Sequence, residues 1–189
     1  MSWKSVTARQ VWHGCRFVRS VLLIAYVGAT TMGHIQYPSA ILADWMEQAL
    51  SAAREGVRRG QAPFAAAIYR NGQCIAAAHN TVNTDCELTR HGEVNAIDAA
   101  CQTMCTMNLK GCVLVSTGEP CALCASAAML ARVDAIIYGA DHQCIADAGY
   151  ATLDQRCEDF IQCCSQNVPV IGGIRRHECE RLLRDNPAN

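Results

Sequence analysis

The chain has 189 residues, which is enough for one domain with a sizeable core. Its composition, 51% hydrophobic and 17% charged, excludes an intrinsically disordered protein. The net charge of −1 disfavours a protein that depends on a basic surface to bind nucleic acid. Thirteen cysteines are an odd number for a secreted disulfide scaffold, and they favour a reducing, cytoplasmic location.

Residues 1–38 are interpreted as an N-terminal extension to a working domain over residues 39–189. Four basic residues precede a short apolar stretch at 21–27, a pattern typical of a weak signal peptide. The stretch is too short to span a bilayer, so no membrane association is expected. For residues 1–31 three interpretations stay open: a presequence, a disordered extension, and a misassigned start with translation beginning at Met32.

The first elements of the domain follow from apolar spacing. Apolar residues at helical spacing predict a helix that begins at Ser39 and ends before Gly60. Two short apolar runs, 64–69 and 74–78, then flank Asn71-Gly72, which is typical of a β-hairpin.

The rest of the chain alternates between helical patterns and short apolar runs. The expected helices are 91–104, 120–132, 153–164 and 178–184, and the expected strands are 112–116, 135–139 and 168–171. A hairpin followed by this alternation predicts an α/β sandwich whose later strands are parallel.

Three side chains have the chemistry and spacing of zinc ligands. Cys121 and Cys124 are three apart at a helix start, so their sulfurs face the same way. The positive end of that helix helps to keep both thiols ionised, as zinc binding requires. His91 is the third candidate ligand. Three protein ligands leave one tetrahedral position for water, which is typical of a catalytic zinc.

Glu93 is the candidate catalytic residue, because a carboxylate beside the metal can accept a proton from water. It can then pass protons to a ring nitrogen and to departing ammonia. His-x-Glu followed by Pro-Cys-x-x-Cys is the known signature of zinc deaminases. Two alternatives stay open: cysteines that only pack, and a structural zinc with His142 or Cys144 as a fourth ligand.

These residues resemble the cytidine-deaminase-like superfamily, in the branch of guanine deaminases, fungal-type cytosine deaminases and tRNA adenosine deaminases. The resemblance runs from about Ser39 to Arg184, and it is most specific in the two metal-binding motifs. It implies a three-layer α/β/α sandwich with a central mixed sheet of about five strands. It also implies one Zn²⁺ per chain, a homodimer, and substrate contacts from Asn80, Gly92 and Phe64.

Further candidate pocket residues follow the strand at 135–139. They are Asp141, His142, Tyr150 and Asp154. In guanine deaminases an acidic side chain that assists the base stands near the position of Thr152, where Asp154 is a candidate substitute. The competing interpretation is that all four are ordinary loop and packing residues.

The function expected from the sequence is hydrolytic deamination of a free nucleobase or nucleoside with a guanine-like or cytosine-like ring. The alternative is conversion of adenosine to inosine in tRNA, which requires a basic groove for the nucleic acid. A third candidate, a zinc module without catalytic activity, conflicts with a carboxylate at Glu93 beside an open metal position.

Overall fold

The computed structural model describes residues 37–188, so the interpretations of residues 1–31 lie outside the described part. The helices are α1 (Ser39–Arg58), α2 (Val82–Asp85), α3 (Gly92–Met104), α4 (Ala122–Leu130), α5 (His142–Asp147), α6 (Cys157–Gln162) and α7 (Arg176–Asp185). The strands are β1 (Ala65–Arg70), β2 (Gln73–His79), β3 (Cys112–Gly118), β4 (Ala135–Ala140) and β5 (Val170–Ile171). In this part of the chain no helix is long and apolar enough to cross a membrane.

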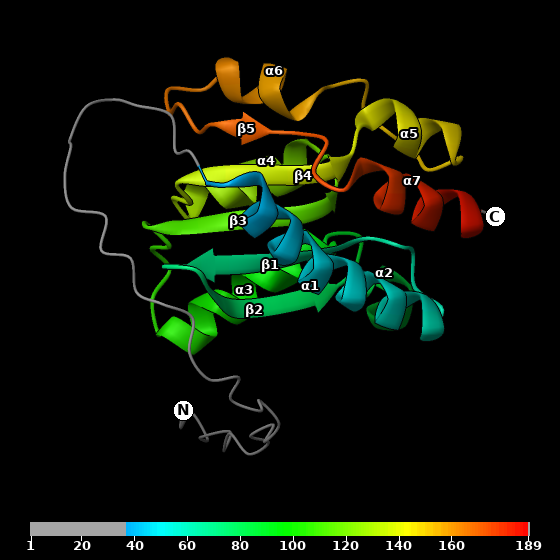
Figure 1. Cartoon of the computed structure of the whole chain (residues 1–189), viewed down its shortest axis with the longest axis horizontal. Coiled ribbons are helices and arrows are strands. Elements are labelled where there is room, and N and C mark those ends of the chain that lie inside the picture. Colours follow the sequence, from blue (N-terminus) through cyan, green and yellow to red (C-terminus); the bar gives the residue numbers. More distant parts are fainter. Residues whose placement is uncertain (1–36, 189) are drawn as a thin grey trace, which may run out of the picture. The chain divides into compact units, whose positions relative to one another are not determined.

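The five strands form one mixed sheet in the order β2-β1-β3-β4-β5 (Figure 1). β1 is antiparallel to both β2 and β3, whereas β3, β4 and β5 run parallel to one another. The hairpin forms because Asn71 and Gly72 both adopt positive φ, the conformation that a two-residue turn between strands requires. The sheet therefore confirms the predicted hairpin and the later parallel strands.

Helices cover both faces of the sheet. α1 and α7 pack on one face, over a core that includes Leu50, Val115 and Leu183. On the other face α3, α4 and α6 enclose a core that includes Ile68 and Leu114. Figure 1 shows α1 in front of the strands, with α3 and α4 behind them. This is the expected three-layer α/β/α sandwich.

Local differences from the predicted elements concern the short helices. The polar connection before residue 91 contains α2, and the segment after β4 forms α5, neither of which was expected. α6 begins at Cys157 instead of 153, and Pro120 lies before the first turn of α4, whose N-cap is Cys121. Helices of four to six residues leave too few apolar repeats for a periodic pattern to be recognised.

Candidate active site

The three candidate metal ligands meet where α3 and α4 begin. His91 is the N-cap of α3, Cys121 is the N-cap of α4, and Cys124 lies in the first turn of α4. His91 Nδ1 is 3.4 Å from Cys124 Sγ and 3.7 Å from Cys121 Sγ, and the two sulfurs are 3.7 Å apart.

This geometry fits zinc. Around a tetrahedral zinc ion, two sulfurs lie about 3.8 Å apart and a sulfur and a nitrogen about 3.6 Å apart. In the described part of the chain, His91, Cys121 and Cys124 are the one group of such side chains whose ligand atoms all lie within 4.8 Å of one another. Neither His142 nor Cys144 belongs to the group, so the alternative of a fourth protein ligand is corrected.

The thiols of Cys121 and Cys124 have pKa values that are shifted in opposite directions. Hydrogen bonds to Cys124 and His91 lower the pKa of Cys121 to about 4. The same contact with Cys121, together with burial, raises the pKa of Cys124 far above its ordinary value. Cys121 is therefore a thiolate at neutral pH, which is the form of cysteine that binds zinc.

Glu93 lies in the first turn of α3 beside these ligands and is only 5% exposed. Its Oε1 accepts a hydrogen bond of 3.0 Å from the hydroxyl of Ser116 on β3. Burial raises the pKa of the Glu93 carboxyl. The arrangement places a fixed carboxylate at the metal site without making it a member of the ligand group.

Gly92, between the ligand and the carboxylate, allows the close approach of α3 to β1. A Cβ at this position would lie 2.6 Å from Ala65 Cα, an atom that cannot move independently of the sheet. Gly92 is buried and is not among the residues that line the adjoining cavity. Its observed contribution is close packing, which brings His91 and Glu93 to the end of the sheet.

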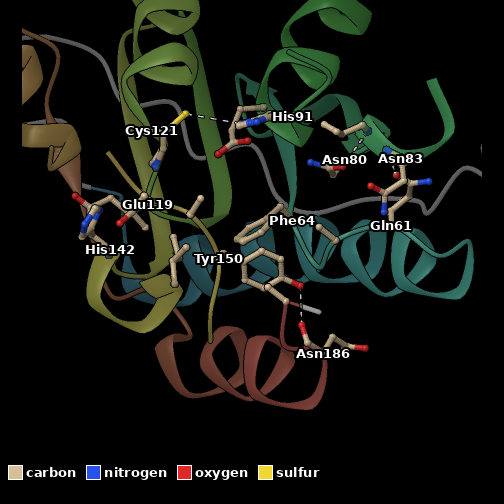
Figure 2. A pocket seen from close by; sticks show the side chains of 18 of the residues that line it. Gln61, Phe64, Asn80, Asn83, His91, Glu119, Cys121, His142, Tyr150 and Asn186 are labelled. Atoms are coloured by element: carbon tan, nitrogen blue, oxygen red, sulfur yellow. Dashed lines mark hydrogen bonds between the residues drawn. The ribbon is translucent and has the colours of Figure 1, made fainter. Parts of the chain in front are cut away.

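A cavity of about 740 Å³ opens beside these side chains. Of the predicted substrate and pocket residues, Phe64, Asn80, His142 and Tyr150 line it. Figure 2 shows His91 and Cys121 at one end and Asn186 at the opposite end, with the rings of Phe64 and Tyr150 between them. The two ring centroids are 4.8 Å apart, in an edge-to-face arrangement.

Asp141 and Asp154 do not line the cavity, which corrects their interpretation as pocket residues. Asp141 is the N-cap of α5, where it accepts a hydrogen bond from the Cys144 backbone, and it also pairs with Arg176 at 2.8 Å. The Asp154 side chain is fully exposed, with an oxygen 3.7 Å from His142 Nε2. Thr152, by contrast, does line the cavity.

Several cavity residues were not expected from the sequence. Gln61 and Asn83 line one side, and the Gln61 amide binds the backbone of Asn83 and the hydroxyl of Thr84. The C-terminal residues Asn186, Pro187 and Ala188 line another side. These polar residues lie in connecting segments, where asparagine and proline are common turn residues, so no signal in the sequence distinguished these positions.

Glu119 is the remaining acidic residue of the cavity. Its carboxylate is 2% exposed and accepts two backbone hydrogen bonds, from His142 N at 2.8 Å and from Cys157 N at 2.9 Å. The resemblance implies that Glu119 fixes the loop by bonding backbone groups, and these two hydrogen bonds are of that kind.

Comparison with known proteins identifies the family. Residues 40–140 match the model of the cytidine and deoxycytidylate deaminase zinc-binding region. The chain belongs to this family. The match confirms the expected superfamily and the expectation of a zinc-dependent deaminase.

Relatives with different substrates resemble the chain to a similar degree. It is 38% identical to a tRNA-specific adenosine deaminase of Bacillus subtilis over 74% of its own length and 84% of that protein. It is also 38% identical to the guanine deaminase of the same organism, over 56% of its own length and 69% of that protein. A solved structure from a study of A-to-I editing by tRNA:A34 deaminases gives a TM-score of 0.65 at 28% identity, covering 74% of this chain and 98% of that one.

One relative is much longer than this chain. A tRNA(Ile)-lysidine synthase of Deinococcus deserti is 35% identical over 79% of the chain, which spans only 27% of that protein. The chain therefore resembles proteins of different total length and different names.

Proposed function

We propose that the chain is a hydrolytic deaminase that releases ammonia from the exocyclic amine of a free nucleobase or nucleoside with a guanine-like or cytosine-like ring. The observation that carries the proposal is the character of the cavity beside Glu93. Within residues 37–188, the side chains that line it include no Lys or Arg. A phosphate group placed in this cavity would find no cation to neutralise it. A neutral ring or nucleoside has no such requirement.

The cavity offers groups that suit a flat polar ring. Phe64 and Tyr150 supply aromatic surface in the middle of the cavity. Asn80 is buried, and its Oδ1 accepts a hydrogen bond from Val82 N at 3.0 Å. In the described part of the chain its Nδ2 has no hydrogen-bond partner, so the amide can donate to a ring carbonyl or ring nitrogen.

The chemistry follows from the four residues at the metal end of the cavity. His91, Cys121 and Cys124 would hold one zinc ion per chain, and zinc when bound acidifies water to give a nucleophile near neutral pH. Glu93 would take one proton from that water and give it to the ring nitrogen, and would then take a second proton from the hydroxyl of the tetrahedral intermediate and give it to the leaving amine. Ser116 holds Glu93 Oε1 in place, so the carboxylate needs little reorientation between these transfers.

A second candidate is deamination of adenosine in tRNA, which is favoured by the similarity to tRNA-specific adenosine deaminases. The charge arrangement of α7 gives it less support. Arg175 pairs with Glu47 and Glu178, and Arg176 pairs with Asp141 and Glu180. These arginines are already neutralised by carboxylates, whereas phosphate binding depends on cations that are available to the nucleic acid.

The decisive experiment measures ammonia release by the zinc-loaded protein from guanine, cytosine, isocytosine, adenine and the matching nucleosides. The same preparation is incubated with tRNA transcripts, and inosine is measured after digestion. Glu93→Gln protein is the control for contaminating deaminases. Release from at least one base or nucleoside, without inosine in tRNA, is the expected result. Inosine in tRNA without release from any base would replace the proposal by the second candidate.

The proposal extends to the assembly and location of the enzyme. The homodimer rests on the resemblance to the deaminase superfamily, because a single exposed apolar side chain such as Leu130 on α4 is ordinary on a protein surface. We propose a homodimer in the cytoplasm, where its thiol ligands stay reduced. Light scattering gives the number of chains in the assembly, and metal analysis should find about one zinc per chain.

A further inference from the structure

The segment between α5 and α6 forms one wall of the cavity. Residues 148–157, here called the wall segment, supply Tyr150, Ala151, Thr152, Leu153 and Gln155 to the cavity lining. Between its two ends it contains no helix or strand, and Leu153 is largely exposed. The position of this wall therefore depends on what holds its ends.

One carboxylate binds the first residue of each helix that flanks the wall segment. Glu119 Oε2 accepts a hydrogen bond from the backbone of His142, the first residue of α5, and Oε1 accepts one from Cys157, the first residue of α6. The first backbone N–H groups of a helix have no partner within the helix, so an outside acceptor is needed where they are buried. Glu119 thus supplies an acceptor to each of two helices that flank the wall segment.

Glu119 is itself tied to the metal end of the cavity. It stands two residues before Cys121, and its own backbone N–H donates to Ala140 O at 2.8 Å, at the end of β4. The charge of its buried carboxylate is partly offset by Arg156, whose Nε lies 3.6 Å away. Figure 2 shows Glu119 between Cys121 and His142. Metal end and wall segment are therefore joined through a single side chain.

We propose that Glu119 is a positioning residue that fixes the wall segment at a set distance from the metal ligands, and that it thereby determines substrate affinity instead of the chemical step. Both carboxylate oxygens accept backbone hydrogen bonds, so the role assigned to Glu119 is to hold the backbone and not to carry out a step on the substrate. The proposal rests on the proposed function, because the wall is expected to enclose the ring that is deaminated.

Three variants test this assignment. Glu119→Ala removes both acceptors, and Glu119→Gln retains one carbonyl oxygen but turns an amide donor towards the other backbone N–H. Asp141→Ala is the matched control. It removes the side-chain cap of α5 and the ion pair with Arg176, but it leaves the link through Glu119 intact. Each protein is assayed on guanine and on cytosine, and its zinc content is measured.

The expected result is a split between kinetic constants. Glu119→Ala should raise KM about tenfold with kcat within about threefold of the wild type and with unchanged zinc content. The KM of Glu119→Gln should lie between the values of the wild type and of Glu119→Ala, and Asp141→Ala should leave KM unchanged. A purely structural role would lower stability without this KM effect. Unchanged KM in Glu119→Ala, or an equal rise in Asp141→Ala, would overturn the assignment.

Amide hydrogen exchange supplies a readout that does not depend on activity or on a soluble variant. In the wild-type protein the amides of His142 and Cys157 should exchange slowly, while those of residues 151–155 exchange fast. In Glu119→Ala all of these should exchange fast. Fast exchange at both His142 and Cys157 in the wild type would refute the assignment even if the variant does not fold. If the wild type releases ammonia from no base, the proposed function fails, and the exchange result still decides the role of Glu119.

Discussion

The metal end of the cavity and its opposite walls are built in different ways. His91, Glu93, Cys121 and Cys124 all lie at the N-terminal ends of two helices packed on the sheet, and their positions follow from regular backbone geometry. The wall segment and the C-terminal residues 186–188 are irregular, and a few hydrogen bonds hold them in place. We infer that the helix ends carry the chemistry of the reaction, and that the irregular walls select the ring that is bound.

The largest expected effect comes from removing a ligand at the rigid end. Cys121→Ala should lose zinc and lower kcat by at least about three orders of magnitude, because the metal contributes several kcal/mol to the reaction. Metal analysis and ammonia release measure the two effects. Cys144→Ala is the control, since Cys144 lies on α5 and binds Glu180 instead of the metal group. Zinc loss in Cys144→Ala alone would show that the ligand set is misassigned.

Glu93→Gln separates the metal from the proton transfer. The variant should keep its zinc but lower kcat by about 10²- to 10⁴-fold, because an amide cannot accept and return the proton. Ser116→Ala, which removes only the hydrogen bond to Glu93, should have a smaller effect of less than about tenfold. Near-normal turnover by Glu93→Gln would show that another group carries the proton.

The same difference between the two regions explains which parts of the fold and of the site could be predicted from the sequence. The spacing of Cys121 and Cys124 and the hairpin at Asn71-Gly72 are local patterns, so the sheet, its long helices and the metal cluster were all predictable. The walls were not, because Asn186 meets Tyr150 across 36 residues and no periodicity links them. Asp141 was predictable as the N-cap of α5, because aspartate is one of the residues preferred at that position and its side chain accepts a hydrogen bond from Cys144 N.

Tyr150→Phe tests whether a single contact sets the position of the C-terminal wall. The Tyr150 hydroxyl donates to Asn186 O at 2.7 Å, while its ring contacts Phe64. Losing this bond should raise KM about three- to tenfold with little change in kcat, because about 1 kcal/mol of wall attachment is lost. Tyr69→Phe is the control: its hydroxyl also meets a backbone carbonyl, at Trp45, but it lies in the core under α1. An equal rise in KM in both variants would show a general loss of packing instead.

The smallest effect is expected at the helix that precedes the C-terminal wall. Glu47 on α1 pairs with Arg54 and with Arg175, the N-cap of α7. Hydrogen bonding to Arg54, followed by the contacts with Arg175, lowers the pKa of Glu47. Its stabilising effect is therefore present above the unfolded-state pKa, near pH 4.5, and is lost as the pH falls through the folded-state value.

Glu47→Gln should accordingly lower the free energy of unfolding at pH 7 by only about 0.5–1 kcal/mol, since the carboxylate is 41% exposed and the pair is screened by water. The difference from the wild type should be smaller at pH 3 than at pH 7, because protonation of Glu47 removes the ion pair as the pH falls, and it should also be smaller in 1 M salt. Urea unfolding at the two pH values measures it. Glu55→Gln on the same helix is the control, because its arginine partners Arg58 and Arg59 are local and exposed. KM should stay unchanged in both variants. A raised KM in Glu47→Gln would mean that the rigid scaffold, and not single contacts at the cavity, sets the position of the C-terminal wall.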